Sequence, residues 1–372
     1  MAVAAILGIA SVITALYFSS NVGTNRFVPN ACTNVDSLLS DRIVGQDAAI
    51  SSLVSAVCEH IRERPGGDPV RPLVISVHGP PGTGKTYTHT LLARAMYNRD
   101  PSKALSCPGP GCTGVKVLYG MSYIESEQET QLEMVRRAVM EHIRSTPDPI
   151  LVIEEYDKLD CKSRAMLRQL VRHHELIDED KGRMIIFLES NLGFMELVNL
   201  VTTERGNKSR ITQETTDRIL RQVSLDSWLA ASCESLEDTV AFATTIHQYL
   251  AFLPLTRQDM AVLVGKELAH NYARRVAALG AELTWDPTVV QWLLNKGDYD
   301  QNNFPLDGAA QVASLCVRYV ARHFRMYEIE QRNKLTANGI QVHKARVQSL
   351  ERLRLSVAPG GGELQLRAGK GG

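Results

Sequence analysis

A phosphate-binding loop follows the first predicted strand of this chain, and it restricts the fold more than any other feature. Residues 79–86 read GPPGTGKT, directly after the apolar run LVISVH at 73–78 and directly before a helical pattern. In this setting the glycine-rich backbone turns its N–H groups toward one anion, and the helix start adds the positive end of its dipole. The pattern therefore predicts a nucleotide phosphate site at the end of a buried strand.

The loop residues have distinct expected roles in this site. Backbone N–H groups would bind phosphate oxygens, the Lys85 ammonium would bridge the β- and γ-phosphates, and the Thr86 hydroxyl would bind Mg²⁺. We therefore predict ATP and Mg²⁺ as the ligands. The predicted nucleotide-binding residues of the loop are Gly79, Pro80, Pro81, Gly82, Thr83, Gly84, Lys85 and Thr86.

Two adjacent glutamates follow a second buried strand. The run ILVIE at 150–154 ends in Glu154, and Glu155 comes next. A P-loop enzyme needs one carboxylate at the magnesium ion and another to orient or deprotonate the attacking water. We assign Glu154 to Mg²⁺ and Glu155 to catalysis. Asn191 follows a further strand and is predicted to hold the same water from the other side, with a helix cap as its alternative role.

Short apolar runs alternate with amphipathic helical patterns over most of the chain. Continuous apolar strands separated by helices predict an α/β fold, with a parallel five-stranded sheet flanked by helices. From Thr256 onward the strands stop and helices dominate, except for a hairpin within residues 353–367. The predicted strands are 73–78, 115–119, 150–154, 184–189 and 249–253, and the late helices are 256–280, 286–295 and 308–330.

These patterns divide the chain into four expected segments. The shift from strands to helices near Pro254 is the main boundary. The segments are an apolar signal or anchor with a linker at 1–30, a nucleotide-binding α/β domain at 31–254, a small helical lid domain at 255–345, and a C-terminal hairpin with a Gly-rich tail at 346–372.

The N-terminus and the cysteines bear on the compartment. Residues 1–18 carry no charged side chain, and a bilayer span needs about 20 apolar residues. This stretch therefore predicts an uncleaved signal-anchor or a signal peptide, with a buried helix or a misassigned start codon as alternatives. Cys107 and Cys112 bracket a Pro-Gly turn that would bring two thiols together. Asn207 begins a glycosylation sequon.

The charge balance argues against a protein that coats nucleic acid. Lys plus Arg and Asp plus Glu both number 41, so the formal net charge is zero, whereas phosphate-backbone binding needs a cationic surplus. Between residues 318 and 354, however, basic residues outnumber acidic ones nine to three. This stretch is either a solvated helix face or a docking face for an acidic partner or lipid headgroups.

The motifs together resemble those of AAA+ ATPases, in particular the Clp-type branch and its eukaryotic relatives, the torsins. The resemblance covers roughly residues 35–330, and its motifs follow one another in the torsin order and spacing. They are IVGQ at 43–46, SVHG at 76–79, EYDKL at 155–159, SN at 190–191 and FLPL at 252–255.

The resemblance implies a P-loop AAA+ fold with a helical lid, and it adds Ile43 and Val44 as residues that contact the adenine. It also implies a homo-oligomer that remodels a protein substrate. Torsins face the endoplasmic reticulum lumen and the nuclear envelope, which agrees with membrane association through the N-terminus.

Several positions depart from the family pattern. Thr86 stands where torsins usually carry Asn, Glu154 stands where family members usually have Asp, and Ala310 stands where a lid cation is expected. No arginine lies between Arg221 and Arg257, so the chain offers no obvious arginine finger. The resemblance implies a membrane-bound activator that supplies it. The alternative is a pseudo-ATPase scaffold that binds ATP without hydrolysing it.

The loop assignment makes ATP binding depend on Lys85. Replacement by Ala removes the only side-chain cation of the loop while the backbone donors remain. A charge-assisted hydrogen bond contributes roughly 1.5–3 kcal/mol, so we expect Lys85→Ala to weaken ATP binding by about tenfold or more with the fold intact. Titration calorimetry with ATP measures this, and equal affinity of variant and parent would refute the loop assignment.

Overall fold

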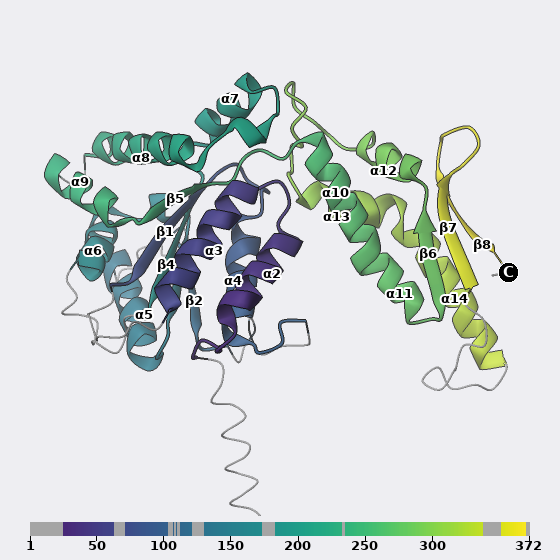
Figure 1. The fold of residues 1–372 in the computed structure, drawn as a ribbon, viewed down its shortest axis with the longest axis horizontal. Helices are drawn as coiled ribbons and strands as arrows, with labels where there is room; N and C mark the ends of the chain where they lie inside the picture. Colours follow the sequence, from purple (N-terminus) through teal and green to yellow (C-terminus); the bar gives the residue numbers. More distant parts are fainter. Residues whose placement is uncertain are drawn as a thin grey trace, which may run out of the picture. The chain divides into compact units, whose positions relative to one another are not determined.

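The chain folds into two compact units, seen in a computed structural model that describes residues 25–62, 71–102, 107, 109, 112–120, 130–172, 183–232, 235–337 and 351–369 (Figure 1). The first unit runs to Leu253, and the second comprises Pro254–Gly372 together with Pro81–Thr83 of the loop. The apolar stretch 2–18 lies outside the described residues. Among the helices that are described, none has both the length and the apolar character needed to cross a membrane.

The first unit contains the predicted parallel five-stranded sheet. Its strands are ordered β2-β3-β4-β1-β5 and every neighbouring pair is parallel. The fold class predicted from the apolar runs is therefore confirmed, and only the last two strands shift by one or two residues at their ends. The strands are β1 (Leu73–His78), β2 (Val115–Tyr119), β3 (Ile150–Glu154), β4 (Ile185–Ser190) and β5 (Gln248–Ala251).

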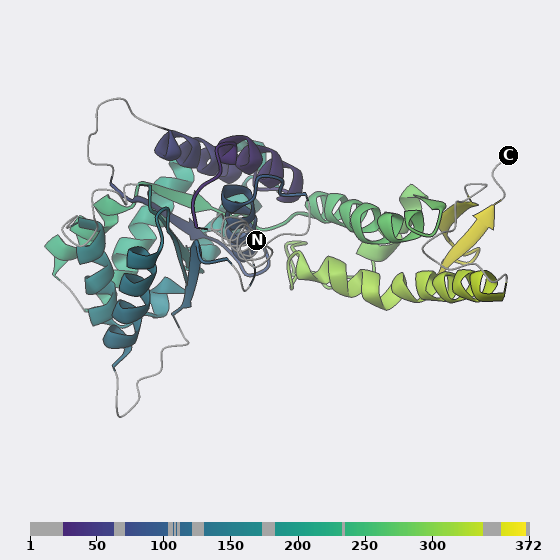
Figure 2. The same ribbon diagram turned by 90° about the horizontal axis from the view of Figure 1, so that it is seen from below.

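Helices cover both faces of this sheet, as Figures 1 and 2 show. Alternate strand residues such as Ile75, Val152 and Phe187 point to one face, where they form a single buried cluster with α2, α3 and α4. The described helices of the first unit are α2 (Ala31–Arg42), α3 (Asp47–Ile61), α4 (Lys85–Tyr97), α5 (Gln131–Ser145), α6 (Cys161–Arg172), α7 (Phe194–Thr203), α8 (Gln213–Ala230) and α9 (Leu236–Thr245), with short turns η1 (Tyr156–Lys158) and η4 (Lys208–Arg210).

A reciprocal pair of hydrogen bonds joins the N-cap of α3 to the segment that follows β5. The Gln46 side chain donates to the Leu253 carbonyl at 2.9 Å and accepts from the Leu253 N–H at 2.8 Å. Gln46 is almost fully buried, so losing either bond would leave an unsatisfied polar group at a cost of roughly 1–3 kcal/mol. The pair thereby ties residues that are 207 positions apart in sequence.

The second unit corrects one expectation, because strands do not stop at Thr256. A strand that the sequence reading missed, β6, pairs in parallel with β7 of the predicted C-terminal hairpin. AELTW at 281–285 buries alternate residues, but the run is short and lies directly between two helical patterns. The elements are α10 (Arg257–Glu267), a π turn η5 (Leu268–Ala273), α11 (Arg274–Ala277), β6 (Ala281–Trp285), α12 (Pro287–Leu294), α13 (Ala310–Tyr319), α14 (Ala321–Ala337), β7 (Glu351–Val357) and β8 (Leu364–Gly369).

Several arginines of the basic stretch pair with acids of their own unit. Arg322 contacts Glu363 at 3.0 Å, and Arg354 contacts Asp286 at 2.6 Å. All four side chains are at least partly exposed, so these ion pairs contribute little stability. They support the reading of this stretch as a solvated face, although residues 338–350 of it lie outside the described part.

Candidate functional site

The predicted phosphate loop joins β1 to α4 in a tightly turned backbone. Gly82 and Gly84 have φ values of 72° and 105°, a region that favours glycine, and Gly84 is the N-cap of α4. Gly79 has no room for a side chain, because a Cβ there would lie 2.1 Å from the Phe252 carbonyl oxygen. Pro81 is exposed and Thr83 is buried. The loop thus has the conformation that its sequence requires.

Lys85 begins α4 and points its ammonium group back into the loop. Its Nζ donates to the carbonyl oxygens of Gly79 at 2.9 Å and Pro80 at 3.0 Å, and to Asn191 Oδ1 at 2.9 Å. The side chain is 6 % exposed, and burial lowers the pKa of the ammonium while the nearby carboxylate of Glu189 opposes that shift. Three acceptors therefore compensate a buried cation at the position expected for phosphate binding.

Asn191 serves Lys85 and does not cap a helix. The helix after β4 is α7, and its N-cap is Gly193, with a φ of 78°. Asn191 lies two residues earlier, partly exposed, with its amide oxygen on the Lys85 ammonium. The structure thus brings together two residues that are 106 positions apart, and it leaves the helix-cap alternative without support.

The register of the sheet aligns the strand ends that carry the polar residues. Glu154 of β3 pairs with Glu189 of β4, and His78 of β1 pairs with Ser190 of β4. Parallel strands place their carboxyl ends at one edge of the sheet, so these side chains lie beside the loop that follows β1. Glu189 is a site residue that the sequence reading did not single out.

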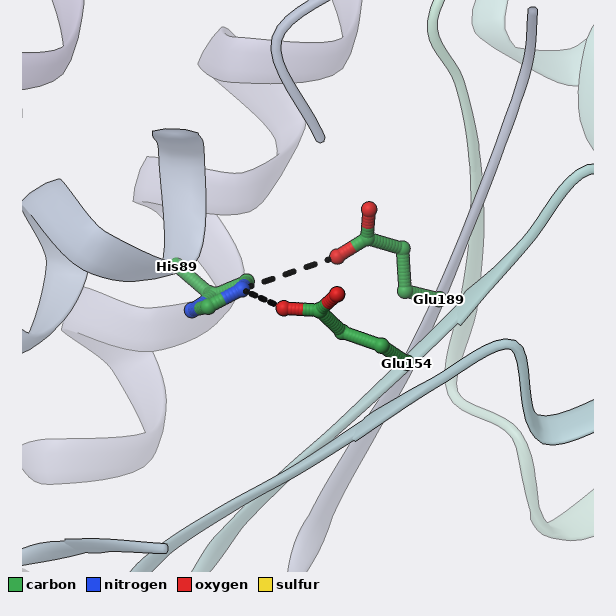
Figure 3. Close-up of side chains that lie close together, drawn as sticks. All are labelled: His89, Glu154 and Glu189. Carbon is green, nitrogen blue, oxygen red and sulfur yellow. Dashed lines mark hydrogen bonds and ion pairs between the residues drawn. The ribbon is translucent and has the colours of Figure 1, made fainter. Parts of the chain in front are cut away.

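One histidine and two glutamates form a cluster at the carboxyl ends of the strands (Figure 3). Thr86 contacts this cluster through Glu189. His89 Nε2 is 3.0 Å from Glu154 Oε1 and 3.7 Å from Glu189 Oε2. The Thr86 hydroxyl donates to Glu189 Oε1 at 2.8 Å. Burial raises the pKa of the Glu189 carboxyl, and the hydrogen bond from Thr86 opposes this. Glu189 and His89, which the sequence did not predict, thus connect the two predicted magnesium residues, Thr86 and Glu154.

Glu155 has an unusual backbone conformation. Its φ of 52° and ψ of 43° lie in the left-handed region, which is uncommon for a residue other than glycine. Its carbonyl accepts from the Lys158 N–H at 2.8 Å, which closes the turn η1. Such strain of roughly 1–3 kcal/mol persists where surrounding structure enforces it and is frequent at functional sites. The side chain is partly exposed, which leaves it accessible to a substrate.

The predicted adenine segment lies against the loop. Ile43 is the C-cap of α2 and is 7 % exposed. Its Cδ1 atom is 3.9 Å from where a Cβ on Gly84 would stand. Val44 beside it is partly exposed. The Lys208 ammonium donates to the Gly45 carbonyl at 2.9 Å. The apolar side chain of Ile43 therefore lies next to Gly84 of the phosphate loop. The hydrogen bond from Lys208, which the sequence did not predict, holds the backbone of the segment at Gly45.

A buried network beneath the site joins β1, β4 and η1. His78 Nε2 lies 2.7 Å from Ser76 Oγ, and His78 Nδ1 lies 3.1 Å from the Leu192 carbonyl oxygen. Because a carbonyl only accepts, Nδ1 carries the proton of the neutral ring. A hydrogen bond of 3.2 Å joins Ser76 Oγ to Tyr156 Oη. Burial lowers the pKa of His78 to about 4, so the ring is neutral at physiological pH.

Two residues of the site carried weak signals in the sequence. His89 follows Lys85 by four positions, which places it one helical turn further along α4. Glu189 ends the apolar run of β4, as Glu154 ends that of β3. A search for polar residues at every strand end would have found Glu189. His89 becomes recognisable only when the helix is placed over the sheet.

Two family models match parts of the chain. A model described as Torsin matches residues 17–105, and one described as AAA domain matches residues 70–193. Together they include the phosphate loop, Glu154, Glu155 and Asn191. They agree with the parallel sheet and with the motifs at the strand ends.

Curated relatives fall into the same two groups. The chaperone protein ClpB of Chlamydia pneumoniae is 28% identical over 278 residues, which are 72% of this chain and 29% of that protein. Torsin-like proteins of Drosophila melanogaster and Caenorhabditis elegans are 24% and 22% identical, over 66% and 77% of this chain and 69% and 75% of their own lengths. The chain thus spans less than a third of ClpB. The predicted resemblance to torsins and the Clp branch of AAA+ ATPases is confirmed.

The buried neutral His78 makes stability depend on pH. Its pKa is about 4 in the folded state against 6.5 when exposed, so the unfolded chain takes up the proton first as pH falls. Stability present above pH 6.5 is lost between 6.5 and about 4, by roughly 3 kcal/mol for this group. We expect the unfolding free energy of His78→Gln to fall less over this window. Urea titrations followed by circular dichroism test this, and parallel pH profiles for variant and parent would contradict it.

Proposed function

We propose that this torsin-like chain of the Clp branch of AAA+ ATPases binds ATP with Mg²⁺ and hydrolyses it when a partner completes its site. The observation that carries the proposal is the set of contacts that the Lys85 ammonium makes with the loop and with Asn191. The ammonium lies within the phosphate loop and contacts Asn191, while Glu154 and Glu155 stand at the neighbouring strand end. ATP would replace the loop carbonyls as partners of this cation.

The oxygen donors beside the loop fit a magnesium ion. The Thr86 hydroxyl and the carboxylates of Glu154 and Glu189 are the hard oxygen ligands that Mg²⁺ prefers. Glu189 Oε2 is buried and accepts no hydrogen bond within the described part of the chain, which supports a further ligand at this place. Thr86 and Glu154 would hold the ion, with Glu189 orienting Thr86. The bound ion would neutralise negative charge on the β- and γ-phosphates.

Glu155 and Asn191 are the residues that we assign to the attacking water. Glu155 is partly exposed at the end of β3, and its carboxylate is suited to orient or deprotonate a water. Asn191 would hold the water from the β4 side once the nucleotide draws Lys85 toward the phosphates. Ile43 and Val44 would contact the adenine, since the segment borders the loop.

An arginine finger from another protein completes this proposal. The chain has no arginine between Arg221 and Arg257, the stretch where Clp-type proteins carry theirs. Loss of such a finger costs about 10³–10⁵ in phosphoryl transfer, so the isolated chain would turn over slowly. We propose a homo-oligomer with a membrane-bound activator, and a protein substrate that the assembly remodels.

The location that best fits is the lumen of the endoplasmic reticulum and nuclear envelope, with membrane association through the N-terminus. Two disulfides between described residues support an oxidising compartment. Cys32–Cys58 joins α2 to α3, and Cys107–Cys112 closes the predicted turn, with Cα atoms 5.1 and 4.8 Å apart. Asn207 of the sequon is exposed at the start of η4, where an oligosaccharide would be accommodated.

The two glutamates should differ in their effect on hydrolysis. With an arginine-bearing partner we expect phosphate release to rise by about 10³–10⁵ over a near-background rate for the isolated chain. Glu155→Gln should abolish this turnover and trap the ATP-bound complex. Glu154→Asp should keep or raise activity, because AAA+ ATPases usually carry the shorter aspartate side chain at this position. Misplacing a reacting group by about 1 Å costs roughly a hundredfold in rate, and the shorter side chain would not add to such a displacement.

Exposed Glu237→Gln is the matched control for loss of one carboxylate. Brisk turnover by the isolated chain, or a Glu155→Gln variant as active as its parent, would contradict the proposal. If ATP drives assembly but no partner produces turnover, the chain is an ATP-binding scaffold.

Location is tested separately in sealed microsomes. We expect the folded units to resist added protease until detergent is present, and Asn207→Gln to remove a mobility shift that is sensitive to endoglycosidase. Complete digestion without detergent would place the units in the cytosol and exclude the lumenal proposal.

A further inference from the structure

His89, Glu154 and Glu189 bring three possible metal ligands together from three different elements. The nearest ligand atoms all lie within 4.8 Å of one another, and two of the separations are 3.0 and 3.7 Å (Figure 3). Ligand atoms at about 2.1 Å from a tetrahedral ion stand about 3.4 Å apart. Two of the three separations bracket this value and the third is no more than 4.8 Å, so modest side-chain rotations would let the three groups share one ion.

The site is desolvated and already oriented. The side chains of His89 and Glu189 are 6 % and 7 % exposed, and that of Glu154 is 14 % exposed. The Thr86 hydroxyl holds Glu189 Oε1 at 2.8 Å, which turns Oε2 toward the histidine ring. Oε2 is buried and accepts no hydrogen bond from any residue that the structure describes. A hydrogen bond such as the one from Thr86 to Glu189 Oε1 commonly fixes the orientation of a metal-binding carboxylate.

Charge and ligand type select the kind of ion. Two carboxylates and a neutral imidazole together carry two negative charges, which one divalent cation neutralises, whereas a protonated imidazole would neutralise only one. Imidazole suits Zn²⁺ and related transition metals, while Mg²⁺ takes oxygen ligands and gives up its waters reluctantly. One imidazole in a set of three therefore favours a transition metal.

We propose that His89, Glu154 and Glu189 bind one divalent transition-metal ion of the Zn²⁺ or Co²⁺ class in the absence of nucleotide. The site shares Glu154 with the magnesium position of the proposed ATPase, but binding of the transition metal requires neither ATP nor hydrolysis. If the chain proves not to hydrolyse ATP, the metal-binding proposal still stands. If the transition metal does not bind, ATP binding is still tested separately by the Lys85→Ala variant.

The test titrates untagged, nucleotide-free full-length protein with Co²⁺ and Zn²⁺. We expect one ion per chain, visible d–d absorption from nitrogen and oxygen ligation of Co²⁺, and displacement of Co²⁺ by Zn²⁺. A hundredfold excess of Mg²⁺ should not displace it. His89→Gln and Glu189→Gln should each weaken binding at least tenfold. The control is His247→Gln, which alters a histidine directly before the edge strand β5. This variant should bind the metal as the parent does.

Circular dichroism checks the fold of each variant. Should His89→Gln and Glu189→Gln both unfold, line broadening of the His89 ring signals by Mn²⁺ in the parent decides the question. The proposal is overturned if the parent binds no tighter than its folded His89→Gln variant, if Mg²⁺ displaces Co²⁺ readily, or if the His89 signals are unaffected. In those cases His89 acts only as an ion-pair partner of the two carboxylates.

Discussion

The buried Lys85 ammonium must be compensated, and the rest of the site is arranged around that requirement. An uncompensated charge in an interior costs several kcal/mol. Here the compensation comes from the Gly79 and Pro80 carbonyls and from the Asn191 amide. The cation therefore connects the loop after β1 with the segment after β4, and any anion that binds in the loop must compete with these acceptors.

Parallel pairing supplies the geometry for this compensation. The register that sets Glu154 beside Glu189 also sets His78 beside Ser190, so polar residues from three strands reach one edge of the sheet. Beneath them, hydrogen bonds join His78 to Ser76 and to the Leu192 carbonyl. The network links the base of the loop to the segment that carries Asn191, and it supports the site from the buried side.

The carboxylates illustrate why a strand end is hard to interpret one strand at a time. Glu154 was recognisable because it stands beside Glu155 after a strand, whereas Glu189 ends an otherwise similar apolar run without a neighbouring acid. In the folded unit Glu189, and not Glu154, accepts the Thr86 hydroxyl. Its position decides how the predicted magnesium residues are connected, and no pattern within β4 reveals that contact.

Local pattern determined the parallel sheet, the phosphate loop, the C-terminal hairpin and the roles expected of Lys85 and Glu155, because each depends on apolar runs or on spacing between near neighbours in sequence. Only the tertiary structure decided the partners of Lys85, the insertion of β6 beside β7, and the approach of His89 to Glu154 and Glu189. Apart from the two carbonyl oxygens within the loop, these contacts join residues that are 65 to 106 positions apart in sequence. Their geometry depends on how α4 packs on the sheet and how strands pair, which are properties of the whole fold.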